Sequence, residues 1–455
     1  MLPQDVKTAA DAMKIIEERG VTHIKVGLFD TDGVMRGKYI SKQKFTSALE
    51  TGLGFCDVVL GWDSNDQLYD NVTFTGWHTA FPDAPVRILP ETCREIPFEP
   101  NTLLFLCEFA GKAEELCPRG VLRRSIERAR SMGFEPYAAL EYEFFLFDET
   151  PHSVREKGYR NLKNITPGFY GYSTLRNSVW ADFHHQFLEM CERMRMPIEG
   201  LHTETGPGVL EAAIGVDKAM EAGDKANLFK TFAKVLAQRH NMMATFMAKW
   251  SRDWPGQSGH VHISLKDKKG GSAFHDSEDP HGMTVAMKQF VAGQRALMPQ
   301  LLAMVASTVN SYTRLIPGFW APTHATWGVE NRTTALRVIP GSPKSQRVEY
   351  RIAAADANPY LALAVALASG LWGIENELEL PPPVKGNSYA AQHPETASLP
   401  ATLWEAAQWL KASKAARALF GDAFVEHYAA SREWEERESR KHISDWQLQR
   451  YFEII

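Results

Sequence analysis

The feature that most constrains the fold is a short alternation of charged and apolar residues in the segment Arg347–Ile352. Arginine, glutamate and arginine occupy every second position there, and valine, tyrosine and isoleucine fill the positions between them. In a β-strand this period of two directs the charged side chains to one face and the apolar side chains to the other. Such a face suits a site that holds phosphate, carboxylate and a cation together, although a solvated face of ion pairs has the same pattern.

The composition is that of a soluble globular protein with two or three domains. The chain has 455 residues, of which 44% are hydrophobic and 23% are charged. A net charge of -5 indicates neither a nucleic-acid partner nor a membrane surface. We find no secretory signal and no apolar run of about 18 residues, the length of a membrane span. Five scattered cysteines without a CxxC pair predict reduced thiols in a cytoplasmic protein.

We predict a small α+β domain at 1–113 and a longer α+β domain at 114–455. The expected elements of the first domain are a helix at 8–19, strands at 21–29 and 34–40, and a helix at 42–51. The second domain begins with a predicted helix from Pro118 to Gly133, and amphipathic helix dominates 400–455, for example at 403–412. Strands and helices alternate without a regular βαβ period, which disfavours a doubly wound sheet.

Two glutamates share one face of a predicted strand in the segment EYEFFLFD. Glu141 and Glu143 are two positions apart, among aromatic residues. Carboxylates on a face of this kind need a counterion if they are buried, because unpaired buried charge is costly. The alternative is an edge strand whose acidic face meets solvent.

Two further segments carry acids and imidazoles. In Glu199–Glu211 a Gly-Pro-Gly loop lets the chain turn back, so that Glu204 and Glu211 can converge, although a plain turn with acidic shoulders is the alternative. In SGHVHIS, His260 and the two alternate residues after it share one strand face. A histidine pair two positions apart is a common metal-ligand spacing, yet it is also found in structural roles.

The residue types near these histidines indicate which metal ion they could bind. No cysteine lies near the histidines, so oxygen atoms and one imidazole are the expected ligands, which suit Mg²⁺ or Mn²⁺ better than structural zinc. Glutamates, histidines and arginines on short strands and glycine-rich loops are what a metal-dependent phosphoryl-transfer site needs. The sequence has no GxxxxGK[ST] motif and no kinase-type glycine-rich loop, so the nucleotide is held in another way.

Taken in order, these segments resemble the glutamine synthetase family over essentially the whole chain. The motifs that carry the resemblance are EYEFFLFD, TETGPGVLE, SGHVHIS, NSYTRLIPG, the run NR…LR…RVEYR, and DANPYLALA. The resemblance implies an α+β fold with a β-grasp N-terminal domain and a catalytic domain whose antiparallel strands form a funnel with helices outside. It also implies ATP as substrate, two or more Mg²⁺ or Mn²⁺ ions per site, and a homododecamer of two stacked hexameric rings with sites between adjacent subunits.

The resemblance also implies roles for individual residues. The expected metal ligands are Glu143, Glu204 and Glu211 near the amine and glutamate, and Glu141, His260 and Glu349 near the nucleotide phosphates. The expected nucleotide contacts are Glu199, His262, Ser264, Arg337, Lys344 and Arg347. Arg314 and Arg351 resemble the arginines that bind glutamate in this family. Arg332 and Arg337 resemble the two arginines that contact the phosphates and the transferring group. The expected catalytic residues are Arg332, Arg351 and Asp57.

The sequence departs from the ammonia-using members at two loops. Those members carry a glutamate in a context like PGYEAP. At that position this chain has Trp320, in the segment Pro317–Pro322. An indole neither accepts a proton nor carries charge. Where they have a loop like FDGSS, this chain has Phe55–Leu60, in which Asp57 is kept but aliphatic residues replace the serines. Both changes make the acceptor site more apolar, although a packing role for Trp320 in a rearranged loop is the alternative.

The function predicted from the sequence is an ATP-dependent ligase of nitrogen catabolism that joins the γ-carboxylate of L-glutamate to an organic amine through γ-glutamyl phosphate. The resemblance is greatest to the γ-glutamylpolyamine and γ-glutamylalkylamide synthetase branch. Polyamines, alkylamines, ethanolamine and aromatic amines all stay open as acceptors, and a close analogue of glutamate stays open as the acid. The alternatives are a glutamine synthetase that uses ammonium and a non-catalytic structural or regulatory ring.

Overall fold

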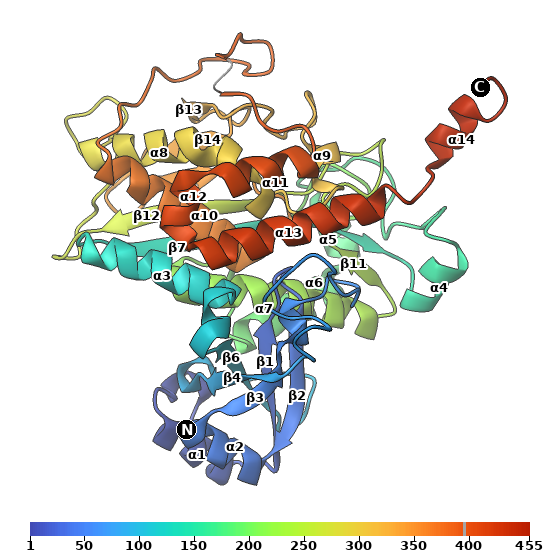
Figure 1. Ribbon diagram of the computed structural model, residues 1–455, viewed down its shortest axis with the longest axis vertical. Coiled ribbons are helices and arrows are strands. Elements are labelled where there is room, and N and C mark those ends of the chain that lie inside the picture. The colour runs from blue at the N-terminus through green and yellow to red at the C-terminus, as the bar shows by residue number, and fades with distance from the viewer. Residues whose placement is uncertain (395–396) are drawn as a thin grey trace.

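The chain folds around two β-sheets, a small one at one end of the long axis of the molecule and a larger one in its body (Figure 1). The structure is a computed structural model that describes residues 1–394 and 397–455. The smaller sheet is formed by the N-terminal part, and the larger sheet lies in the body of the molecule among helices from the rest of the chain.

The N-terminal sheet has the strand order β2-β1-β6-β4-β3, with β5 paired to β6. Its strands are β1 (His23–Phe29), β2 (Met35–Ser41), β3 (Leu53–Cys56), β4 (Asp83–Ile88), β5 (Arg94–Glu95) and β6 (Leu103–Phe109). Strand β1 runs antiparallel to β2 and parallel to β6. The helices of this part are α1 (Ala9–Glu18), whose cap Thr8 accepts from Asp11, and α2 (Lys42–Thr51), which ends at Gly52 in the left-handed region.

The larger sheet has the order β13-β14-β15-β12-β7-β9-β8, and the short strands β10 and β11 also pair with β7. Its strands are β7 (Glu135–Phe147), β8 (Ile198–Thr203), β9 (Val209–Ile214), β10 (Asp217–Lys218), β11 (Met243–Thr245), β12 (Gly259–Lys266), β13 (Trp327–Val329), β14 (Leu336–Ile339) and β15 (Arg347–Tyr350). Neighbouring strands are antiparallel except for β13 and β14, which are parallel. This pair is a departure from the antiparallel sheet that we expected.

Helices pack outside the larger sheet (Figure 1). They are α3 (Pro118–Ser131), α4 (Pro151–Glu156), α5 (Thr174–Val179), α6 (Ala181–Arg193), α7 (Ala219–Arg239), α8 (Val285–Leu301), α9 (Ser311–Arg314), α10 (Pro359–Glu375), α11 (Leu403–Ala412), α12 (Lys414–Phe420), α13 (Asp422–Ser439) and α14 (Asp445–Tyr451). Short 3-10 helices lie at Pro3–Asp5, Asp57–Leu60 (η2), Pro90–Thr92, Gly111–Glu115 and Leu302–Met304.

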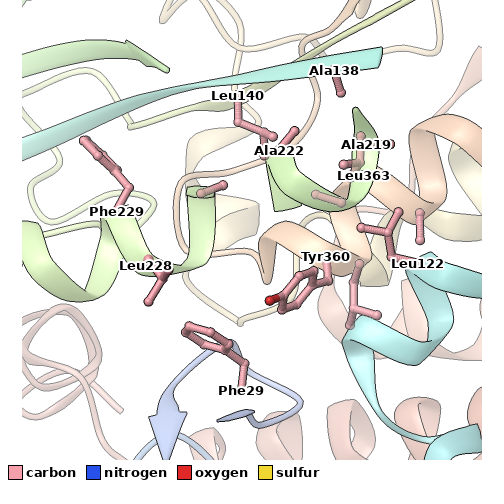
Figure 2. Packing of buried hydrophobic residues seen from close by; sticks show 14 of the residues in the cluster. Phe29, Leu122, Ala138, Leu140, Ala219, Ala222, Leu228, Phe229, Tyr360 and Leu363 are labelled. Carbon is pink, nitrogen blue, oxygen red and sulfur yellow. The ribbon is translucent and has the colours of Figure 1, made fainter. Parts of the chain in front are cut away.

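One hydrophobic core joins the two parts of the chain. Figure 2 shows Phe29 of β1 beside Tyr360 of α10, and their ring centroids are 5.8 Å apart. Hydrogen bonds reinforce this junction, because Asn358 donates to the carbonyl oxygens of Asp30 and Thr31. The small sheet is therefore fixed against the helices that support the larger one.

Several expectations for local structure are confirmed. The predicted helices at 8–19, 42–51 and 403–412 match α1, α2 and α11, and the helix expected from Pro118 is α3. The first sheet ends at Phe109 and the second begins at Glu135, so the predicted domain boundary lies between them. Whether 1–113 and 114–455 fold as separate domains stays a prediction.

The last helix, α14, projects away from the body of the molecule (Figure 1). It buries none of its own residues, and Trp446, Phe452, Ile454 and Ile455 near it are exposed. Among the described residues, none of the helices is both long enough and apolar enough to cross a membrane.

Candidate active site

Pairing across the larger sheet brings together acids that are far apart in the sequence. Glu141 on β7 lies opposite His260 on β12, and Glu143 lies opposite Glu211 on β9. On the other side of β12, Glu349 of β15 is the register partner of a second histidine, His262. The periods of two that we read from the sequence therefore place the charged side chains of adjacent strands in one neighbourhood.

The first cluster surrounds Glu349, which is buried. His260 Nδ1 lies 3.2 Å from Oε1 of Glu349 and 3.2 Å from Oε1 of Glu141. Arg351 Nη1 donates to Oε1 of Glu349 at 2.5 Å, and Arg337 Nη1 donates to its Oε2 at 3.1 Å. Burial opposes ionisation of Glu349, but the neighbouring His260 and Arg351 outweigh it and lower its pKa to about 2. The carboxylate is thus held ionised.

The second cluster joins Glu143, Glu204 and Glu211. Glu143 Oε2 accepts from the backbone N and from the hydroxyl of Ser258, at 2.6 and 2.7 Å. His202 Nε2 lies 3.4 Å from Oε1 of Glu211, and its Nδ1 lies 3.8 Å from Oε2 of Glu204. Burial and neighbouring glutamates raise the pKa of Glu211 to about 8, although its hydrogen bond with His202 acts in the opposite direction. This cluster is therefore short of positive charge.

Both clusters fit divalent cations. Two groups place ligand atoms within 4.8 Å of one another, namely Glu141, His262 and Glu349, and His202, Glu204 and Glu211. Within the part of the chain that the structure describes, the buried Oε2 of Glu204 has no hydrogen-bond partner. Carboxylate oxygens with an imidazole suit Mg²⁺ or Mn²⁺. A cation would supply the charge that the raised pKa of Glu211 shows to be missing.

The hydrogen bonds distinguish the two histidines of β12. His262 Nδ1 accepts from Nε of Arg347 at 3.2 Å, so a neutral His262 carries its proton on Nε2 and offers no lone pair there. Burial and the charge of Arg351 lower the pKa of His260, which leaves its imidazole neutral and able to coordinate. These hydrogen bonds favour His260 as a ligand and His262 as a donor to a bound anion, and the ligand role expected for His260 stays a prediction.

Two cavities meet at Glu141, which lines both. The first has a volume of about 270 Å³, and the second a volume of about 350 Å³. The expected nucleotide contacts that line the first cavity are Glu199, His262, Ser264, Lys344 and Arg347. The expected metal, glutamate and amine residues that line the second are Glu143, Glu204, Glu211, His260, Arg314, Trp320, Arg332 and Arg351. Most of the predicted site is thus gathered around one shared carboxylate.

Arg337 and Asp57 lie outside both cavities. Arg337 pairs with Glu330 and Glu349, beside the first cluster. Asp57, in η2 of the N-terminal part, is buried and accepts from the hydroxyl of Thr75 at 2.6 Å. Its predicted role in amine binding stays a prediction.

The arginines of the second cavity are held in different ways. Arg314 donates to the carbonyl oxygens of Ile352 and Arg351 at 3.0 and 3.2 Å, which fixes its guanidinium. Arg351 Nε is buried and, among the described residues, lacks a hydrogen-bond partner. Arg332 is exposed and lines the cavity. Guanidinium groups in this arrangement can bind carboxylate and phosphate oxygens.

The loop at 317–322 forms one wall of the second cavity. Trp320 is 58% exposed, and its φ of 62° is in the left-handed region that non-glycine residues seldom adopt. Beside it, Phe319 lies under the ammonium of Lys249, 4.2 Å from the ring centroid. The wall is apolar and aromatic, in agreement with the change of character read from the sequence.

Sequence reasoning missed three residues of this neighbourhood. His202 shares the period of two with Glu204, and this spacing could have indicated it. Tyr172 stacks on His202 with ring centroids 4.4 Å apart and lines the second cavity, but no sequence pattern indicates it. Tyr389 has a buried hydroxyl with no partner in the described part of the chain, close enough to Arg351 and Arg314 for their charges to act on its pKa.

The fold and the paired cavities define the class of protein. A family model described as "Glutamine synthetase, catalytic domain" matches residues 115–451, and the chain belongs to this family. It is 44% identical to "Type-1 glutamine synthetase 2" of Dictyostelium discoideum, over 95% of this chain and 84% of that protein. It is 36% identical to "Glutamate--isopropylamine ligase" of Pseudomonas sp, over 100% of both chains.

Further relatives and solved structures agree with this assignment. The chain is 34% identical to "Gamma-glutamylethanolamide synthetase GlnA4" of Streptomyces coelicolor, over 93% of this chain and 91% of that protein. The solved structure described as "GmaS/ADP complex-Conformation 1" is similar with a TM-score of 0.84 and 23% identity, over 97% of this chain and 99% of that one. The predicted α+β fold of the glutamine synthetase type is confirmed.

Proposed function

We propose that this chain is an ATP-dependent ligase that joins the γ-carboxyl group of L-glutamate to an organic amine. The observation that carries the proposal is the pair of cavities that share Glu141, one lined by nucleotide-type contacts and the other by arginines and the aromatic loop of Trp320. Relatives named for ligation of isopropylamine and for synthesis of a γ-glutamylethanolamide support an organic acceptor.

The first cavity suits the nucleotide. Lys344 and Arg347 supply positive charge at its walls, and His262 offers a donor next to Glu141. The two acidic clusters would hold Mg²⁺ or Mn²⁺, which when bound neutralises charge on phosphate oxygens. Arg337 donates to Glu349 through Nη1 and to Glu330 through Nε, so a contact with the phosphates would require it to release one of these partners.

The second cavity suits the acid and the acceptor. Arg314 and Arg351 would hold glutamate, and the exposed Arg332 would stabilise the transferring phosphoryl group. An oxygen of the γ-carboxylate attacks the terminal phosphorus of ATP, which gives γ-glutamyl phosphate and ADP. The lone pair of the neutral amine then attacks the acyl carbon, phosphate leaves with the C–O bonding pair, and the nitrogen loses a proton.

A glutamine synthetase that uses ammonium is the second candidate. The 44% identity to a protein named as a glutamine synthetase favours it. Against it stands Trp320, because the aromatic wall supplies neither the charge that attracts ammonium nor a base for its proton. The two candidates share the phosphorylation step and differ only in the acceptor.

We also propose that the chain works as a homo-oligomer, of which the dodecamer is the expected form. The projecting helix α14 with its exposed apolar residues supports this, as does the absence of Asp57 from the lining of the cavity in its own chain. Deletion of 441–455 should lower the molar mass measured by light scattering. An unchanged mass would contradict a role for α14 in assembly.

Phosphate release tests the proposed function. Purified protein with ATP, Mg²⁺ and L-glutamate is assayed with ammonium and with a panel of amines, and the amide product is identified by mass spectrometry. We expect release that depends on both glutamate and amine, with a higher kcat/KM for an organic amine than for ammonium. If ammonium has the highest kcat/KM, the chain is a glutamine synthetase instead.

A further inference from the structure

Arg337 on β14 is an expected nucleotide contact that lies outside the first cavity, although the other five expected contacts line it. Register pairing places Arg337 opposite Glu349 on β15. Its guanidinium is shared between two carboxylates, because Nη1 donates to Oε2 of Glu349 at 3.1 Å and Nε donates to Oε2 of Glu330 at 3.0 Å. These two acids therefore decide where the guanidinium lies.

The two carboxylates differ in what they would lose without Arg337. The side chain of Glu349 is buried, and it keeps Arg351 as a second ion-pair partner next to His260. The side chain of Glu330 is 50% exposed, and within the described part of the chain Arg337 is its ion-pair partner. A carboxylate that loses a partner is hydrated where it meets water, whereas a buried one is not. Glu330 is therefore the partner that Arg337 can release.

The turn that carries Glu330 fixes its backbone beside Arg337. Glu330 directly follows β13, and its φ of 50° is in the left-handed region that non-glycine residues seldom adopt. Its backbone N donates to the carbonyl oxygen of Val338 on β14 at 3.0 Å, which holds this conformation. Its side chain lines a third cavity, of about 720 Å³, and so has room to move. The position of the residue is thus fixed while its carboxylate can leave the guanidinium.

Arg337 lies next to the first cavity through its contact with Glu349. Ligand atoms of Glu349 lie within 4.8 Å of those of Glu141 and His262, and these two residues line that cavity. A guanidinium bonded to Glu349 therefore needs only a side-chain rearrangement to reach an anion bound there. Phosphate oxygens match the fork of a guanidinium, and a triphosphate carries more negative charge than one carboxylate. A nucleotide phosphate is thus a stronger partner for Arg337 than Glu330 is.

We propose that Glu330 is a positioning residue that holds Arg337 outside the first cavity until a nucleotide phosphate replaces it. Arg337 keeps its hydrogen bond to Glu349 in both arrangements, and only the contact with Glu330 is exchanged. Glu330 thus competes with the phosphates for one guanidinium and lowers the affinity for nucleotides that are long enough to reach it. This inference rests on the proposed function, which supplies the nucleotide.

Nucleotide binding tests this exchange without turnover. Isothermal titration calorimetry measures the Kd of AMP-PNP, an ATP analogue whose terminal phosphoryl group is not transferred, in the presence of Mg²⁺, and the Kd of AMP for comparison. We expect Glu330→Gln to lower the Kd of AMP-PNP about fivefold, the value of a partly exposed ion pair, and to leave the Kd of AMP within about twofold. A raised or unchanged Kd of AMP-PNP in this variant overturns the inference.

A second background separates the exchange from a general effect of charge. In Arg337→Ala, the further change Glu330→Gln should no longer alter the Kd of AMP-PNP, because the competition acts through this guanidinium. A gain that persists there comes from the loss of negative charge alone and overturns the inference.

The matched control is Glu377→Gln, since Glu377 is also an exposed glutamate with a φ of 50°. It should leave the Kd of AMP-PNP unchanged, and a gain equal to that of Glu330→Gln counts against a specific role for Glu330. Failure of AMP-PNP to bind the unchanged protein contradicts the proposed function and this inference together. Binding that Glu330→Gln does not alter overturns this inference alone.

Discussion

The two cavities that share Glu141 are built from different kinds of structure. The nucleotide side is lined largely by strands β7, β9 and β12 and by the turn at 344–346. The acceptor side takes only part of its lining from strands, and the rest comes from loops at 204–205, 255–258 and 319–321. The acid that both cavities share, Glu141, lies on the sheet, whereas the aromatic groups that would meet the amine lie on a loop.

Because of this difference, residues of the phosphorylation step and residues that contact the amine lie on separate parts of the structure. Ladder hydrogen bonds fix the position of a strand residue, so a change of side chain elsewhere leaves the acidic clusters in place. Loops have few such constraints and tolerate substitution. A family built in this way can keep one phosphorylation step and change its amine, which agrees with relatives that are named for different acceptors.

The largest loss of activity is expected from substitution of Glu349, the acid on β15 that pairs with two arginines. Glu349→Gln removes the charge that a cation needs and leaves the guanidinium groups of Arg337 and Arg351 without their carboxylate. We expect phosphate release to fall about a thousandfold with either ammonium or an organic amine. Removal of divalent metal by a chelator should abolish the activity of the unchanged protein in the same assay.

The matched control is Glu375→Gln, which breaks a surface pair with Arg128 far from the cavities. It should retain nearly full activity, because exposed ion pairs contribute little. Activity of Glu349→Gln within about tenfold of the unchanged protein would show that this carboxylate is not part of the metal site.

A smaller effect, limited to the binding of ATP, is expected from substitution of Arg347 in the nucleotide cavity. Arg347→Ala removes a positive charge from its wall and the hydrogen bond that orients His262. KM for ATP should rise about thirtyfold, the value of a lost hydrogen bond to a charged group, while KM for glutamate stays the same. Steady-state kinetics with each substrate varied in turn measures this.

The control for Arg347 is Arg130→Ala, an exposed arginine that pairs with Glu135. An equal rise in KM for glutamate in Arg347→Ala would mean that the two cavities are not functionally separate. The strand-lined cavity and the loop-lined cavity would then not bind their substrates independently.

The same division explains what the sequence could predict. Alternation in EYEFF, HVH and RVEYR gives the strand faces, because a period of two fixes orientation without any knowledge of the fold. The contact between Ser258 and Glu143 joins residues 115 positions apart and depends on strand pairing that no local pattern contains. Tyr172 and Tyr389 reach the site from irregular segments, where side-chain direction follows from tertiary contacts. Asp57 lines neither cavity of its own chain, and no local pattern indicates this.

On the acceptor side, a single loop substitution should change the choice of nitrogen donor. Trp320→Glu introduces a charge and a base at the wall of the second cavity. We expect the ratio of kcat/KM for ammonium to that for butylamine to rise about tenfold, with KM for ATP unchanged. Trp320→Gln, which is polar but uncharged, is the control that separates charge from loss of the indole. An unchanged ratio in Trp320→Glu would mean that the loop does not set the acceptor.

The smallest effect concerns Tyr389, a half-buried tyrosine that lies near Arg314 and Arg351 of the second cavity. The segment that carries Tyr389 is tied to the loop of Arg332, because Ser388 N donates to the hydroxyl of Thr333 at 2.9 Å. The hydroxyl of Tyr389 and Nε of Arg351 are both buried, and neither has a partner in the described part of the chain. Groups of this kind are stabilised when a ligand or a water joins them.

Tyr389→Phe should therefore raise KM for glutamate about fivefold, the cost of one neutral hydrogen bond, and leave KM for ATP and for the amine unchanged. Tyr350→Phe is a close control, since the hydroxyl of Tyr350 is also buried without a partner but lies on the strand face opposite to Glu349. Equal effects of the two variants would point to packing alone. A selective effect of Tyr389→Phe would show that a loop residue, which the sequence pattern does not reveal, completes a site whose charges are set by strands.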